Sequence, residues 1–177
     1  SASAIDHSLC DERLMVPGNR DGFLPGEAAA AVLLSRAGAA AEGLVIRGWG
    51  EAIERSHWDN EIPNRSQGLA QAVRLACDAA RLDPLKLEFR VSDQNGESYY
   101  TREAGNAFTR LLFSGGKIGL LTLADKIGEV GAATGVAALA FLSDVMLRPD
   151  CSPGQVGVVH LANDNGRRCA VIVQAHS

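Results

Sequence analysis

The chain has 177 residues, of which 46% are hydrophobic and 21% are charged, and its formal net charge is −4. This length corresponds to one domain, since domains commonly hold roughly 100 to 200 residues, and it is large enough for a core of its own. No run of five or six like charges occurs, so binding to nucleic acid or to an anionic membrane surface is not expected. The longest weakly polar run, residues 130–142, is too short for a membrane span, which needs about 20 apolar residues.

Small residues dominate the composition. Alanine and glycine together account for 46 of the 177 residues, whereas aromatic residues make up only 5%. This predicts a core packed by close backbone approach. The four cysteines lie far apart without paired Cys or His spacing, so the sequence predicts neither a zinc site nor a disulfide scaffold, and it implies no cofactor. No charged start followed by an apolar stretch opens the chain, which predicts a cytoplasmic protein.

The first third of the chain predicts one irregular region and two strands. Residues 1–26 contain two Pro-Gly turns, and residues 1–19 are expected to be an irregular lead-in. Residues 27–35 end in Val-Leu-Leu, which is typical of a strand buried on both faces, although their four alanines leave a helix open. Residues 44–46 predict a second strand, and the glycines that follow predict a bend or bulge.

The middle of the chain alternates between helix and strand patterns. A helix is expected from Gly68, because its apolar residues recur at helical spacing until Asp83-Pro84 ends it. Residues 85–91 alternate apolar and charged side chains, which indicates a half-buried strand. The patterns that follow predict a turn, a second helix and a short strand, at residues 93–96, 99–112 and 118–123.

The last third predicts a buried helix and a hairpin. Residues 130–148 are apolar almost all round, and such a helix must be covered on all sides. Strands are expected at residues 156–161 and 169–173, and the Asn-Asp-Asn-Gly between them favours a type I′ turn. His160 lies inside an apolar strand and is interpreted as a hydrogen-bonded core histidine, not a catalytic base. The whole chain, residues 1–177, is therefore predicted to be a single α/β domain.

Two segments carry a resemblance to a known family. Residues 20–30 read Arg-Asp-Gly-Phe-Leu-Pro-Gly-Glu-Ala-Ala-Ala, and residues 128–135 read Gly-Glu-Val-Gly-Ala-Ala-Thr-Gly. In this order, with a helix and a strand between them, they resemble the Asp-Gly-Phe…Gly-Glu-Gly-Ala and Gly-His-x-x-Gly-Ala-Ala-Gly segments of β-ketoacyl synthases. The resemblance covers roughly residues 20–175. It implies the C-terminal half of a thiolase-like fold, in which a mixed β-sheet, a buried Gly/Ala-rich helix and covering helices are closed by a C-terminal β-hairpin.

The family's catalytic positions are substituted in this chain. A ketosynthase uses a cysteine nucleophile from the first half of its fold, together with two histidines and a lysine from the second. The first histidine corresponds to Ser92, or to Asp93 if the alignment slips by one residue, and the second corresponds to Glu129. The lysine position holds Ala124, with Lys126 two residues away, and the family's Gly-Phe-Gly-Gly loop reads Asn-Asp-Asn-Gly at residues 163–166.

These substitutions oppose the usual reaction. A neutral imidazole can donate a hydrogen bond to a developing enolate, whereas an ionised carboxylate only accepts and repels that charge. We therefore expect a chain that is not competent for ordinary decarboxylative condensation, unless burial keeps Glu129 protonated. Two alternatives stay open: an acyltransferase or condensing enzyme completed by a separate half that carries the cysteine, and a non-enzymatic adaptor. Asp93, Glu97 and Glu129 could converge as an acidic site with altered chemistry; the other interpretation is that Asp93 and Glu97 form a turn cap and Glu129 is a favourable charge at a helix start.

The buried helix suggests a partner. If the chain holds only half of the fold, one face of this helix has nothing in the same chain to cover it, and an exposed apolar patch marks an interface. The expected partner is the N-terminal half of the fold, in the same gene product or a second chain, or else a second copy. An acyl carrier protein is a further candidate partner. The residues expected at the interface are Val130, Gly131, Ala133 and Gly135.

Overall fold

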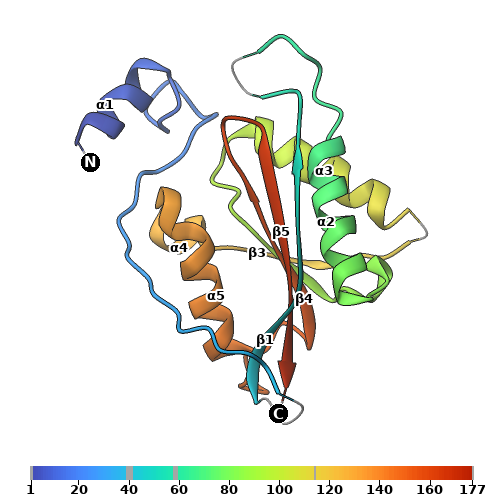
Figure 1. Ribbon diagram of the computed structural model, residues 1–177. Helices are drawn as coiled ribbons and strands as arrows, with labels where there is room; N and C mark the ends of the chain where they lie inside the picture. Colours follow the sequence, from blue (N-terminus) through green and yellow to red (C-terminus); the bar gives the residue numbers. More distant parts are fainter. Residues whose placement is uncertain (1, 39–41, 58–59, 114, 177) are drawn as a thin grey trace.

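A five-stranded mixed sheet with helices on both faces forms the centre of the molecule (Figure 1). The computed structural model describes residues 2–38, 42–57, 60–113 and 115–176. The strand order is β1-β5-β4-β2-β3. Strand β2 is parallel to β3 and β4, whereas β5 is antiparallel to β4 and β1. The strands span Gly43–Ile53 (β1), Phe89–Ser92 (β2), Gly119–Thr122 (β3), Val156–Ala162 (β4) and Arg167–His176 (β5). The predicted α/β class and mixed sheet are confirmed.

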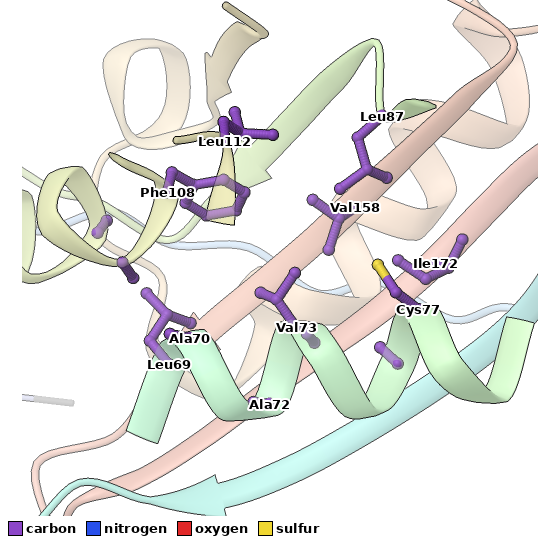
Figure 2. Packing of buried hydrophobic residues seen from close by; sticks show 14 residues of the cluster. Leu69, Ala70, Ala72, Val73, Cys77, Leu87, Phe108, Leu112, Val158 and Ile172 are labelled. Atoms are coloured by element: carbon purple, nitrogen blue, oxygen red, sulfur yellow. The ribbon is translucent and has the colours of Figure 1, made fainter. Parts of the chain in front are cut away.

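Helices α2 (Gln67–Ala80) and α3 (Ser98–Leu111) cover one face of the sheet. The apolar face predicted for the helix after Gly68 is buried, and Figure 2 shows Val73 and Cys77 of α2 directed at the strands that carry Val158 and Ile172. The buried cluster on this face also contains Phe108 of α3. This face of the sheet is covered more completely than the opposite face, on which α5 packs.

Helix α5 (Thr134–Val145) packs on the opposite face, after α4 (Ala124–Ile127) and the short 3-10 helix η2 (Gly131–Ala133). Its buried residues Ala138, Leu142 and Val145 contact a cluster that includes Phe89 and Val159. The α5 side of the sheet is covered incompletely, because Trp49 and Ile53 on strand β1 are both 63% exposed.

Most predicted elements are present with shifted ends. The expected bulge is a register shift between Ile46 and Gly48. The strand predicted at residues 85–91 begins only at Phe89, because Pro84–Lys86 form the 3-10 helix η1, capped by Asp83. The helix predicted at residues 130–148 is divided into η2 and α5.

The C-terminal hairpin is confirmed, but its turn differs from the expected type. A type I′ turn needs positive φ at both central residues. Among residues 163–166 only Gly166 has a positive φ, of 87°. The Asn163 N–H donates to the Arg167 carbonyl at 2.9 Å, and the Gly166 N–H donates to the Asn163 carbonyl at 3.0 Å. The loop is therefore longer than two residues and closes through a left-handed glycine.

Two N-terminal predictions were wrong. Residues 2–10, expected to be irregular, form helix α1 (Ala2–Cys10). Residues 27–35, expected to be a buried strand, belong to no helix or strand, and the Leu33 side chain is 98% exposed. A β-strand needs a hydrogen-bonded neighbouring strand, and neither edge strand of the sheet, β1 or β3, pairs with this segment. Within the described residues, no helix is long and apolar enough to cross a membrane.

Candidate functional site

Three loops meet at one end of the sheet because β2, β3 and β4 run parallel. The carboxyl ends of parallel strands lie at the same edge, where α/β proteins commonly bind ligands. The loop after β2 holds residues 93–97, the connection after β3 leads to Glu129, and the turn after β4 holds Asp164. The loops that carry the two family histidine positions, at residues 92–93 and at Glu129, are thus brought together by strand topology.

A cavity of about 1050 Å³ opens beside these loops. Its polar end carries the carboxyl groups of Asp93, Glu97, Glu129 and Asp164. Its apolar wall is formed by α5 and by the α5 side of the sheet. The wall residues are Ala52, Ile53, Val136, Leu139, Val159, Leu161 and Val171. The volume is sufficient for a small organic ligand or for side chains of another polypeptide.

Asp93, and not Ser92, faces the cavity. Ser92 is 2% exposed, and its hydroxyl accepts a hydrogen bond from the Gln94 N–H at 3.1 Å. Asp93 accepts one from the Ala162 N–H at 2.5 Å and lines the cavity. Burial, together with the negative charge of Glu129, raises the pKa of Asp93 to about 7. Of the two residues that the sequence left open for the first histidine position, Asp93 is the one that lines the cavity.

Glu129 is held as a hydrogen-bond acceptor. One of its carboxyl oxygens accepts the Gly131 N–H at 2.7 Å, and the other accepts the Asn95 side-chain amide at 2.9 Å. Both carboxyl oxygens of Glu129 are therefore engaged with N–H donors of its own chain. Lys126, which lies in α4, is exposed and is not among the residues that line the cavity.

An ion-pair network closes the polar end. Arg13 contacts both carboxyl oxygens of Glu97, at 2.7 and 3.0 Å, and also binds Asp164 at 2.8 Å. Tyr100 donates a short hydrogen bond to the same aspartate. Burial alone would raise the pKa of Asp164, but the hydrogen bonds from Arg13 and Tyr100 lower it. Burial and the neighbouring Asp164 raise the pKa of Tyr100, so its hydroxyl stays protonated as a donor.

The N-terminal segment is therefore part of the site. Besides Arg13, it supplies Asp21, whose carboxyl accepts the Ser98 N–H at 2.6 Å at the start of α3. Arg13 lies in the region expected to be irregular, so no local pattern predicts its place in the site. Asp164 belongs to a predicted turn, but the strand order that brings this turn beside Glu97 is not visible in local patterns.

His160 is a core histidine, as predicted. It is 1% exposed, and its Nε2 lies 3.4 Å from the Arg90 guanidinium. Burial, together with the positive charge of Arg90, lowers the pKa of His160 to about 3. The imidazole is thus neutral, and it packs against the ring of Phe108 at a centroid distance of 5.1 Å.

The four predicted interface residues differ in their exposure to solvent. Gly131 is exposed at the cavity mouth, and Val130 and Ala133 are half-buried. Gly135 has an explanation within its own chain, because a Cβ there would lie 2.7 Å from the Leu161 side chain. Close approach of α5 to its own sheet, and not only to a partner, thus accounts for this glycine.

Asp93 should make stability depend on pH. Its pKa is about 7 in the folded chain against 3.8 for the ordinary group, so between pH 4 and 7 the folded state retains a proton that the unfolded state has released. Stability should therefore fall as pH rises through this window. We expect Asp93→Asn to remove this fall and to stabilise the chain by about 1–3 kcal/mol at pH 8. Urea denaturation from pH 4.5 to 8 measures it; an equal effect of Asp150→Asn, at an exposed site, would contradict it.

Among the residues that the structure describes, no group of three or more His, Cys, Asp or Glu side chains is placed to hold a metal ion. The acids instead bind N–H and guanidinium donors. The arrangement supplies hydrogen-bond acceptors and, at Asp93, a group that can exchange a proton near neutral pH.

The fold is that of ketosynthase-type proteins. The chain is similar to a chain in the structure of a type II polyketide synthase acyl-carrier protein in complex with its ketosynthase. The TM-score is 0.64, and the identity is 14% over 75% of this chain and 38% of the matched chain. It is similar to a ketosynthase in complex with its chain length factor from Xenorhabdus doucetiae, with a TM-score of 0.63 and 12% identity over 77% and 40%. A β-ketoacyl synthase from Burkholderia phymatum matches with a TM-score of 0.60 and 17% identity over 75% and 37%.

The similarity is structural and partial. The chain spans less than half of the length of each of these three proteins. It matches no protein-family model and no curated protein. The expected thiolase-like partial fold is confirmed, and activity and partners are matters for proposal.

Proposed function

We propose that this chain is the C-terminal half of a ketosynthase-like protein that does not catalyse decarboxylative condensation. It would serve instead as a non-condensing component of an acyl-chain-handling assembly, comparable in role to the chain length factor that accompanies one of its structural neighbours. The observation that carries the proposal is the pair of hydrogen bonds that Glu129 accepts, from Asn95 and from the Gly131 N–H.

The chemistry of this position supports the proposal. An enolate that develops beside Glu129 needs a hydrogen-bond donor, because its negative charge must be stabilised. Both carboxyl oxygens of Glu129 already accept hydrogen bonds, and Arg13 is occupied by the carboxyl groups of Glu97 and Asp164. Ala124 stands at the lysine position, and Arg168, which also lines the cavity, is paired with Glu103.

The role requires a partner. The family's cysteine belongs to the first half of the fold, and this chain is similar to only about 40% of its neighbours' length. We propose that the other half, or an equivalent polypeptide, completes the assembly, and that an acyl carrier protein delivers its substrate, as in the neighbouring complex of a ketosynthase with its carrier.

One observation favours a second candidate, an active acyltransferase or condensing enzyme completed in trans. Asp93 has a pKa of about 7 and shares the cavity with Glu129, so one carboxyl could donate a proton while the other accepts one. Such a pair suits general acid–base chemistry even though it differs from the histidine pair.

A decarboxylation assay separates the two candidates. We expect the chain together with the polypeptide that completes its fold, without any further ketosynthase, to release CO₂ from malonyl-coenzyme A or a malonyl-carrier thioester no faster than a protein-free control. Turnover that Glu129→Gln reduces at least tenfold would overturn the proposal in favour of the enzyme. Glu51→Gln is the matched control, since Glu51 lines the same cavity at an exposed position away from the acid cluster.

A further inference from the structure

Two asparagine–glycine pairs occur in the chain, Asn95-Gly96 and Asn165-Gly166. Asparagine is thermolabile in such a pair, because the backbone nitrogen that follows can attack the side-chain amide, and glycine has no side chain to hinder the attack. One pair lies in the candidate site, where Asn95 lines the cavity and Gly96 is exposed. The other lies in the turn between β4 and β5. The chain thus holds one reactive sequence in two different surroundings.

The fold requires the glycine of the pair in the site. Gly96 has a φ of 114°, a conformation that residues with a side chain rarely adopt. A Cβ on Gly96 would lie 2.5 Å from the Gly22 carbonyl oxygen, which is a backbone atom and cannot rotate away. The N-terminal segment packs against the loop after β2 at this point. The same close approach that builds the site therefore keeps a glycine directly after Asn95.

The two pairs differ in the backbone nitrogen that would attack. The Gly96 N–H forms no hydrogen bond with another described residue. The Gly166 N–H, in contrast, donates to the Asn163 carbonyl at 3.0 Å, and the Gly166 carbonyl accepts the Glu54 N–H at 2.8 Å. Gly166 is also buried, whereas Gly96 is exposed. Attack by Gly166 therefore needs a hydrogen bond to break first, and attack by Gly96 does not.

The Asn95 side chain connects two loops of the site. Its Nδ2 donates to a carboxyl oxygen of Glu97 at 3.0 Å and to one of Glu129 at 2.9 Å. Its Oδ1 accepts the Glu97 N–H at 3.1 Å, which stabilises the negative charge that an attack on the amide places on this oxygen. Asn165 receives an equivalent bond from the Arg167 N–H at 3.1 Å, so this contact favours both pairs alike. A carboxylate in place of the Asn95 amide would lose both donated bonds, because it can only accept.

We propose that Asn95 is a site of spontaneous deamidation, which irreversibly makes the candidate site more acidic. The Gly96 nitrogen gives its proton to water and bonds to the Asn95 side-chain carbon. The bond from that carbon to Nδ2 breaks, and the nitrogen leaves as ammonia with the proton. Water then cleaves one of the two carbon–nitrogen bonds of the resulting ring, its hydroxyl going to carbon and its proton to nitrogen, which leaves aspartate or isoaspartate in place of Asn95. The reaction consumes only water, and it removes one of the two N–H donors of Glu129.

Three variants test the reaction and its consequence for the site. Asn95→Gln should stop the conversion, because the ring that Gly96 would have to close is larger; conversion that continued at this position would overturn the reaction. Asn95→Asp should lower the melting temperature, since it puts a third carboxylate beside Glu97 and Glu129. Asn165→Asp is the matched control and should leave the melting temperature unchanged, because Asn165 is exposed and its Nδ2 donates to no described residue. Equal melting temperatures of the two aspartate variants would overturn the consequence.

Peptide mass spectrometry of the full chain, incubated at pH 8, compares the two pairs directly. We expect Asn95 to convert at least fivefold faster than Asn165 in the folded chain. In the chain unfolded by urea the two rates should agree within twofold, because neither glycine is then held. Conversion of Asn165 as fast as that of Asn95 in the folded chain would overturn the proposal. The same rate ratio in urea would overturn it too, since the ratio would then come from the sequence and not from the structure. None of these outcomes bears on the proposed function.

Discussion

Replacing Arg168 by methionine is expected to destabilise the chain by about 3–5 kcal/mol, because it leaves a buried carboxylate unpaired. Arg168 on β5 and Glu103 on α3 are 0% and 1% exposed in their side chains, and the guanidinium donates to both carboxyl oxygens at 2.6 and 2.8 Å. After the substitution, the hydrogen bond that Glu103 keeps among the described residues is the one from Asn64, at 3.1 Å. Denaturation by guanidinium chloride, followed by circular dichroism, measures the loss.

Arg148→Met is the matched control for this prediction. Arg148 forms an ion pair with Asp144 at 2.7 Å, but both side chains are more than half exposed, so its loss should change stability by less than about 0.5 kcal/mol. A double substitution, Glu103→Leu with Arg168→Met, should recover much of the lost stability, since an apolar pair of similar size often replaces a buried ion pair without penalty. Equal effects at the buried and exposed arginines would refute the argument.

The Glu103–Arg168 pair also illustrates which parts of the molecule the sequence could predict. Periodicity placed a helix over residues 99–112 and a strand over 169–173, and both are present with ends shifted by one to three residues. It could not predict that one glutamate of the helix meets one arginine of the strand, because that contact joins positions 65 residues apart. Local patterns report burial and periodicity, whereas pairing depends on the order of strands in the sheet.

The candidate site divides in the same way. Asp93 and Glu129 could be predicted because each follows a recognisable segment, and parallel strands bring such loops together. Arg13 could not, since an arginine in a region without periodicity carries no signal. The failure at residues 27–35 differs in kind: their apolar pattern predicted a strand, but the segment pairs with neither edge strand of the sheet, β1 or β3.

Gly50→Ala should be among the most damaging single-methyl additions, costing at least about 3 kcal/mol. Helix α2 lies directly on β1 at this point, and a Cβ on Gly50 would sit 2.3 Å from the Ala72 carbonyl oxygen and 2.7 Å from the Ala76 nitrogen. These are backbone atoms, so no side chain can rotate away, and the helix must lift from the sheet. Lifting it would open the cluster in which Val73 and Cys77 contact the strands.

Gly105→Ala tests whether this effect comes from contact or from the loss of glycine itself. Gly105 is exposed in the middle of α3, and a Cβ there would meet no heavy atom within 4 Å. Alanine is favoured over glycine in helices by roughly 0.8–1 kcal/mol, so this variant should be more stable than the natural chain. Thermal unfolding of the two variants should thus shift in opposite directions. A shared direction would mean that α2 does not approach β1 as closely as its contacts with Gly50 require, and that the alanine and glycine content has another cause than close packing.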